Sequence, residues 1–129
     1  MPQAQILIEE AARLYARRDQ AVRVPFRADP RLAPRRNECH ANVERWLKLH
    51  PTHKSVRGWL VLDYREVYGH GGYRFFAHSV VEDDAGSRFD VTVQSPYPFL
   101  EIEGDEDDFA MLIHGHDLGA IDYLSCTQV

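Results

Sequence analysis

The chain has 129 residues, a length suited to one domain with a single hydrophobic core. Hydrophobic residues make up 44% and charged residues 27% of the sequence, which excludes a disordered chain. A net charge of −5 argues against nucleic acid as the main partner. No apolar run approaches the roughly 18 residues that a membrane span requires, so we expect no membrane association.

The cysteine content and the N-terminus bear on the cellular compartment. The sequence opens Met1-Pro2-Gln3-Ala4, without the basic region and apolar core of a signal peptide. A disulfide between Cys39 and Cys126 is one alternative. The missing export signal favours the other, which is reduced thiols in the cytoplasm.

The first elements in chain order are a helix and an irregular connector. Apolar residues at helical spacing, from Ile6 to Leu14, predict an amphipathic helix over residues 3–18. Residues 19–36 contain three prolines and show no periodicity, so we expect a connector that lies over the surface.

A second helix is predicted to begin near Asn37 and to end at about His50. Asparagine is a good helix-capping residue, and Pro51 stops the helix at its other end. Cys39 then lies in the first turn. The unpaired N–H groups and the dipole of that turn favour an anion, so they favour the nucleophilic thiolate over the thiol. The alternative is a buried, unreactive cysteine.

From Ser55 onward the apolar period changes from helical to strand-like. Strands are predicted over 56–64, 73–83 and 87–93, with a glycine-rich loop over 69–72. A short helix over 107–113 and a final edge strand over 120–126 follow. The fold class is therefore α+β, with N-terminal helices packed on one antiparallel sheet. Within the single domain 1–129, residues 37–93 form the cysteine helix and β-hairpin core, and 94–129 form a C-terminal extension.

Two residues within the predicted strands are unusual for strand interiors. His78 follows Phe76-Ala77, and Asp90 lies between Phe89 and Val91. A carboxylate flanked by core residues needs a partner or a raised pKa. A cysteine, a histidine and a carboxylate behind the imidazole form the arrangement for acyl transfer from amides or thioesters.

The register of the hairpin decides whether His78 and Asp90 can meet. A two-residue turn gives opposed residue numbers that sum to 171 and places the two side chains on opposite faces. A three-residue loop over 84–86 gives a sum of 170 and places them diagonally on one face. That loop needs a left-handed residue at its third position, where Gly86 stands, so we predict the sum of 170.

These segments together resemble a known superfamily. The runs Cys39-His40-Ala41-Asn42-Val43, Val56-Arg57-Gly58-Trp59, Ala77-His78-Ser79-Val80 and Asp90-Val91-Thr92 are similar to small bacterial and phage members of the papain-like or transglutaminase-like thiol hydrolases. The resemblance covers residues 37–93. It implies a papain-like core with Cys39 as nucleophile, His78 as general base and Asp90 as the residue that orients the base.

The sequence departs from that family in three places. Ser79 follows the histidine where an aromatic residue is common, and Val91 follows Asp90 where proline is common. No glutamine precedes Cys39 to donate to an oxyanion. Asn37 and Asn42 are candidates for that role, and Trp59 is a candidate for substrate binding, although a core position is its alternative.

The expected function is hydrolysis or acyl transfer at the amide bond of a peptide or protein, without a cofactor. The alternative is a catalytically silent binding or structural domain on the same fold. We expect no metal, because His114-Gly115-His116-Asp117 lacks obvious further ligands. The oligomeric state stays open.

Charge is distributed unevenly along the chain. Basic residues crowd the connector and acidic residues crowd a later segment, which predicts either two solvated loops that attract each other or a basic rim for an acidic substrate. The basic residues are Arg23, Arg27, Arg31, Arg35 and Arg36, and the acidic ones are Glu101, Glu103, Asp105, Glu106, Asp107 and Asp108.

Overall fold

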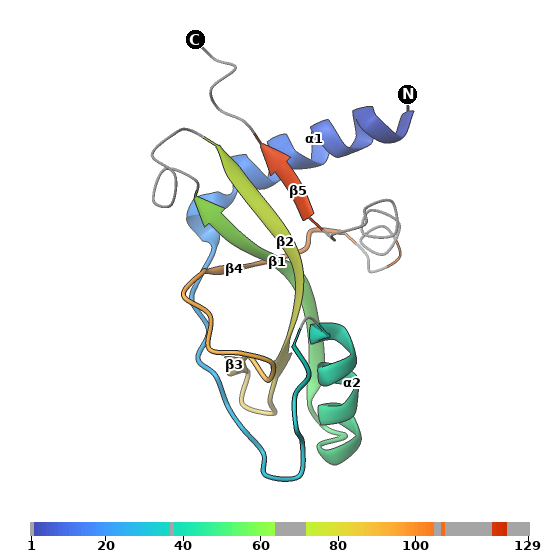
Figure 1. Cartoon of the computed structure of the whole chain (residues 1–129), viewed down its shortest axis with the longest axis vertical. Coiled ribbons are helices and arrows are strands. Elements are labelled where there is room, and N and C mark those ends of the chain that lie inside the picture. The colour runs from blue at the N-terminus through green and yellow to red at the C-terminus, as the bar shows by residue number, and fades with distance from the viewer. Residues whose placement is uncertain (1, 37, 64–71, 105–106, 108–119, 124–129) are drawn as a thin grey trace.

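The computed structural model describes residues 2–36, 38–63, 72–104, 107 and 120–123 (Figure 1). Helix α1 spans Pro2–Ala16 and is followed by a short 3-10 turn, η1, at Arg18–Gln20. Helix α2 spans Cys39–Leu49. No helix among these residues is long and apolar enough to cross a bilayer.

The boundaries of α2 confirm the predicted position of the cysteine and correct the predicted cap. Cys39 is the first residue of the helix, and His50 is its C-cap, with the His50 N–H bound to the Trp46 carbonyl at 2.9 Å. The N-cap residue is Glu38, one residue after the predicted cap Asn37. Asn37 itself lies outside the described residues.

The strands form one antiparallel sheet, and the predicted α+β class is confirmed. Its strands are β1 (Lys54–Asp63), β2 (Tyr73–Glu82), β3 (Arg88–Phe89), β4 (Phe99–Glu101) and β5 (Ala120–Tyr123). Their order is β3-β2-β1-β4, and β5 also pairs with β2. The predicted loop over 69–72, apart from Gly72, and the predicted helix over 107–113, apart from Asp107, lie outside the described residues.

Both helices pack on the same face of the sheet, at opposite ends of β2. Ala11 and Leu14 of α1 pack with Phe75 of β2. Val43 and Trp46 of α2 pack with Val81, near the other end of that strand. Phe75 and Val81 share a face because side chains alternate along a strand. Figure 1 shows α2 beside the half of β2 that is remote from α1.

The predicted hairpin register is confirmed. Val81 lies opposite Phe89 and Glu82 lies opposite Arg88, so the opposed numbers sum to 170. Gly86 has a φ of +84°, the left-handed conformation that the three-residue loop requires. The Asp83 carboxylate also accepts the backbone N–H groups of Ala85 and Ser87, both at 2.9 Å, and so stabilises the turn.

The third predicted strand was too long, because β3 ends at Phe89 and not at Val93. The reason is Asp90. Its Oδ1 accepts the N–H groups of Thr92 at 2.7 Å and Val93 at 3.2 Å, which turns the chain out of the sheet.

The connector is not only an irregular surface segment, as predicted, but also completes the sheet region. Val22 exchanges two backbone hydrogen bonds with Phe99, of 2.9 and 2.8 Å, and Phe26 bridges to Asp90 in a parallel direction. The predicted C-terminal extension likewise supplies β4 and β5 to the sheet. Only residues 120–123 of the predicted strand 120–126 are described.

Gly58 permits β4 to lie where it does. It pairs with His78 in β2 and with Glu101 in β4. A Cβ atom on Gly58 would overlap the Leu100 carbonyl oxygen and would lie 2.6 Å from Cζ of Phe99. The Phe99 ring therefore occupies the space that a side chain would fill, and it contacts the His78 ring edge-on with centroids 6.4 Å apart.

We expect Gly58→Ala to destabilise the fold more than Gly86→Ala. The first variant forces backbone and an aromatic ring apart, at a cost near the upper end of about 1–3 kcal/mol. The second adds a Cβ with nothing within 4 Å, so it costs only the left-handed strain of about 1–2 kcal/mol. Urea unfolding of both variants measures the difference, and an equal or smaller loss for Gly58→Ala would contradict this packing.

Candidate active site

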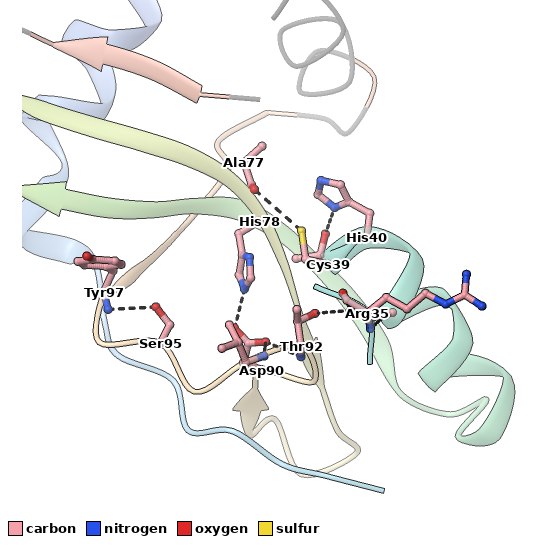
Figure 2. A network of polar contacts seen from close by, with 12 residues as sticks. Arg35, Cys39, His40, Ala77, His78, Asp90, Thr92, Ser95 and Tyr97 are labelled. Atoms are coloured by element: carbon pink, nitrogen blue, oxygen red, sulfur yellow. Dashed lines mark hydrogen bonds and ion pairs between the residues drawn. The ribbon is translucent and has the colours of Figure 1, made fainter. Parts of the chain in front are cut away.

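The thiol of Cys39 lies at the start of α2, against the middle of β2 (Figure 2). Its Sγ is 4.0 Å from the Ala77 carbonyl oxygen. The side chain of the N-cap residue, Glu38, makes no capping hydrogen bond, and the first turn of α2 contains no acidic residue. The N–H groups of this helix start therefore favour an anion at Cys39.

The strand edge beside the thiol is incomplete. In β1, the backbone carbonyl of Arg57 and the backbone N–H of Val61 form hydrogen bonds on the side of the strand that faces β4. The backbone N–H and carbonyl groups of the even-numbered β1 residues therefore point to β2. By the same alternation, Ala77 and Ser79 of β2 direct their peptide groups away from β1. Along that edge β5 pairs as far as Phe76 and β3 begins at Val81. Within the described residues, no strand pairs with the stretch between them.

His78 and Asp90 are brought together as predicted. His78 Nε2 lies 2.5 Å from Asp90 Oδ2, and the two side chains are 7% and 0% exposed. Figure 2 shows the His78 ring between Asp90 on one side and Cys39 on the other. Because Nε2 is engaged by Asp90, Nδ1 is the ring nitrogen left to face the thiol.

Every polar group of Asp90 has a described partner. Oδ2 binds His78 and Oδ1 accepts two backbone N–H groups. Its own N–H donates to the Pro25 carbonyl at 2.8 Å, and its carbonyl accepts the Arg27 N–H at 2.9 Å. A buried carboxylate so bound is fixed in one orientation, and it fixes the imidazole in turn.

The three side chains shift one another's proton affinities. Burial opposes ionisation of the Cys39 thiol, but hydrogen bonds with His40 and His78 and the charge of His78 outweigh it and lower the pKa of Cys39 to about 6. Burial likewise opposes the charged imidazole, but hydrogen bonds and attraction from Asp90 and Cys39 raise the pKa of His78 to about 9. Between these values the pair is a thiolate and an imidazolium.

Of the predicted oxyanion and substrate-binding residues, Asn42 and Trp59 are not brought to the thiol, and Asn37 lies outside the described residues. Asn42 is fully buried, and its Nδ2 donates to the Arg35 carbonyl at 2.8 Å and to Thr92 Oγ1 at 3.0 Å. Its Oδ1 accepts the Arg35 N–H at 3.0 Å and a contact from Arg45. Asn42 therefore clamps the chain before α2 to the turn after Asp90. Trp59 is 1% exposed and belongs to the core beneath α1.

Sequence reasoning missed a second polar cluster beside Cys39. His40 Nδ1 contacts Ser79 Oγ and lies 3.0 Å from Arg57 Nη1. Arg57 donates to Ser79 Oγ at 2.6 Å and to Glu44 Oε2 at 3.2 Å. The available signal was Ser79, a small polar residue at a core position of β2, where it is fully buried.

Two acidic residues of the later segment form ion pairs within the described residues. Arg17 lies 3.3 Å from Glu103 and Arg88 lies 2.7 Å from Glu101, and neither arginine belongs to the connector. Asp105, Glu106 and Asp108 lie outside the described residues, so an attraction between the two segments stays a prediction. The residues 114–117, discounted as a metal site, lie outside the described part of the chain. Among the residues that are described, no three His, Cys, Asp or Glu side chains form a group suited to a metal ion.

We expect Cys39 to ionise with a midpoint near pH 6, well below the value of 9.0 for an ordinary thiol. The thiolate absorbance and the rate of alkylation by iodoacetamide, resolved by peptide mass spectrometry, should both rise through that midpoint. His78→Ala should move the midpoint upward, because it removes the neighbouring positive charge. A wild-type midpoint near 9 would contradict an activated thiol.

The same pair should leave folding stability nearly independent of pH between about 6.5 and 9. The lowered pKa of Cys39 contributes stability that is lost as pH falls through 6, and the raised pKa of His78 contributes stability that is lost as pH rises through 9. Within the window the folded pair binds one proton on His78, and the unfolded pair binds one on Cys39. The opposite effects of pH on stability through Cys39 and through His78 therefore cancel. Urea unfolding of wild type and of the Cys39→Ala, His78→Ala double variant across this window should show parallel profiles, and diverging profiles would contradict the pairing.

No protein-family model matches this chain, and neither a curated protein nor a solved structure is similar to it. The chemistry of the chain is therefore inferred from the contacts among Cys39, His78 and Asp90.

Proposed function

We propose that the chain is a thiol hydrolase or acyltransferase that acts on an amide bond of a peptide or protein. The observation that carries the proposal is the continuous arrangement of thiol, imidazole and carboxylate, with the thiol at a helix start and the buried carboxylate 2.5 Å from the imidazole. This is the arrangement that activates a nucleophile and orients its base.

In the first step, the Cys39 thiolate attacks the carbonyl carbon of the amide. A carbon–sulfur bond forms, and the carbonyl electron pair moves to oxygen. When the oxyanion collapses, the carbon–nitrogen bond breaks and the imidazolium of His78 gives its Nδ1 proton to the leaving amine. The products are an acyl thioester on Cys39, a free amine and a neutral His78.

In the second step, neutral His78 takes a proton from water or from an acceptor amine, which attacks the thioester. The carbon–sulfur bond breaks, and the thiolate–imidazolium pair is restored. Asp90 keeps the imidazole in one orientation throughout, because its Oδ2 stays bound to Nε2. Water gives hydrolysis and an amine gives acyl transfer.

The incomplete edge of β2 supports a peptide as the substrate. Ala77 and Ser79 present peptide groups on the edge where the thiol lies, with no strand opposite them in the described part. An extended peptide could pair with such an edge through its main chain. Its carbonyl carbon would then pass close to Cys39.

The resemblance to papain-like and transglutaminase-like thiol hydrolases supports the same chemistry. It implies a papain-like core in which a cysteine opens a helix, a strand bears the histidine, and an aspartate opens a D-x-T segment. The positions of Cys39, His78 and Asp90 are consistent with that core. A reducing cytoplasm, which would keep Cys39 as a free thiol, is part of the proposal.

The proposal is tested with p-nitrophenyl acetate, an activated acyl donor that needs no knowledge of the natural substrate, and with a pool of synthetic peptides. Wild type should release a burst of p-nitrophenolate equal to its active sites, carry an acetyl group on Cys39 and cleave or transfer some peptides. Cys39→Ala should do none of these. Absence of both the burst and peptide turnover in wild type would indicate the catalytically silent alternative.

Asp90→Asn should preserve the fold but block the base. The Asn carbonyl can still accept the Thr92 and Val93 N–H groups, while its NH₂ group faces His78 Nε2 and forces the ring proton onto Nδ1. That tautomer cannot take a proton on the Cys39 side, so turnover should fall by up to about 10⁴-fold.

The matched control for this variant is Asp90→Ala. It also removes the acceptor of the Thr92 and Val93 N–H groups, so its melting temperature should fall further than that of Asp90→Asn. If Asp90→Asn turned over acyl groups at the wild-type rate, Asp90 would not orient the base.

A further inference from the structure

A second imidazole lies against the thiol. Figure 2 shows the ring of His40 beside the Cys39 sulfur, away from Asp90, so that the sulfur lies between two histidines. Both imidazoles favour the Cys39 thiolate and lower the pKa of Cys39. His40 is half-buried, whereas His78 is buried, so His40 is the one of the two that an incoming substrate can touch.

The partners of His40 Nδ1 determine where its ring carries the proton. Arg57 Nη1, 3.0 Å from Nδ1, can only donate, because a guanidinium has no acceptor. Ser79 Oγ already accepts from Arg57 at 2.6 Å, so its hydroxyl hydrogen can be directed at Nδ1. Both neighbours therefore make Nδ1 an acceptor, and the proton of the ring belongs on Nε2.

We propose, on the basis of the thiol hydrolase function above, that His40 is a catalytic residue whose Nε2–H donates to the oxyanion formed when Cys39 attacks a carbonyl. When the carbon–sulfur bond forms, the negative charge moves from sulfur to the carbonyl oxygen, and the Nε2–H of His40 stabilises it there.

The attack on a carbonyl requires a hydrogen-bond donor for the oxyanion. Acyl transfer depends on fixed donors at the developing oxyanion, and the first-turn N–H groups of α2 can provide one side of that environment. The carboxamide of Asn42 cannot contribute, since Arg35, Arg45 and Thr92 occupy it. His40 follows the nucleophile directly in the same helix turn, on the side opposite the base.

Three residues position the His40 ring. Arg57 lies opposite Ser79 in the β1–β2 pairing, so both side chains point to the face that α2 covers. Glu44, one turn after His40 in α2, binds the far side of the guanidinium at 3.2 Å. Among the described residues, the charged or titratable groups facing His40 include Arg57 from β1 and Cys39 from α2, with Glu44 behind the guanidinium and His78 beyond the sulfur.

The test compares two reactions of Cys39 in the full-length protein. Acylation by p-nitrophenyl acetate passes through an oxyanion, whereas alkylation by iodoacetamide displaces iodide and forms none. In His40→Ala, the limiting acylation rate above the thiol pKa should fall by about 10²-fold or more. The limiting alkylation rate should change by no more than about threefold for each unit by which the pKa of Cys39 shifts, because the nucleophilicity of a thiolate depends only weakly on its pKa. Lys48→Ala, an exposed change in the same helix, should alter neither rate.

Arg57 is tested as a positioning residue by two variants. Arg57→Met removes the donor that fixes the tautomer, so acylation should fall while the limiting alkylation rate holds. Arg57→Lys retains a donor, so it should recover part of the acylation rate. Circular dichroism of each variant confirms that the fold is retained before the rates are compared.

The outcomes separate the two proposals. Failure of wild type both to acetylate Cys39 and to turn over peptides would overturn the hydrolase function and the role of His40 with it. Normal acetylation in wild type and an equal rate in His40→Ala would overturn only the role of His40. So would a parallel loss of acylation and alkylation, which would mean that His40 acts on the thiolate or the fold alone. Selective loss of acylation supports the oxyanion donor.

Discussion

The hydrogen bond between His78 and the buried carboxylate of Asp90 is the constraint on which the rest of the structure depends. A carboxylate with no exposure is costly unless it is fully bound. Its side chain holds the imidazole and ends β3, and its backbone holds the connector at Pro25 and Arg27. Asp90 therefore fixes both the orientation of the base and the path of the chain around it.

The two histidines beside the Cys39 sulfur differ in protonation because their rings have different hydrogen-bond partners. Asp90 accepts from His78 and favours its charged form, so the pKa of His78 is raised and the thiol is drawn toward ionisation. Arg57 and Ser79 instead direct donors at one nitrogen of His40. In the proposed mechanism the first ring moves protons and the second holds the oxyanion. The rings come from α2 and β2, and their environments come from Asp90 after β3, Arg57 of β1 and Ser79 of β2.

Local rules predicted the parts of the site that depend on local geometry. The position of Cys39 in the first turn of a helix that ends before Pro51 follows from the apolar periodicity, and the approach of His78 to Asp90 follows from the glycine at position 86 and the register it imposes. Contacts between distant segments were not predictable. The bridge from Phe26 to Asp90, the pairing of β4 with β1 and the role of Asn42 join residues far apart in the chain, and no periodic pattern marks such pairs. Ser79, a departure from the family pattern, proved to contact His40.

The protonation state of His78 tests the central claim most directly. Nitrogen-detected NMR of the imidazole, assigned with His78→Gln and His40→Gln, reports each ring nitrogen separately. Between pH 6.5 and 9 both nitrogens of His78 should carry protons, with Cys39 as thiolate. A neutral His78 ring with a protonated Cys39 throughout that window would contradict the account.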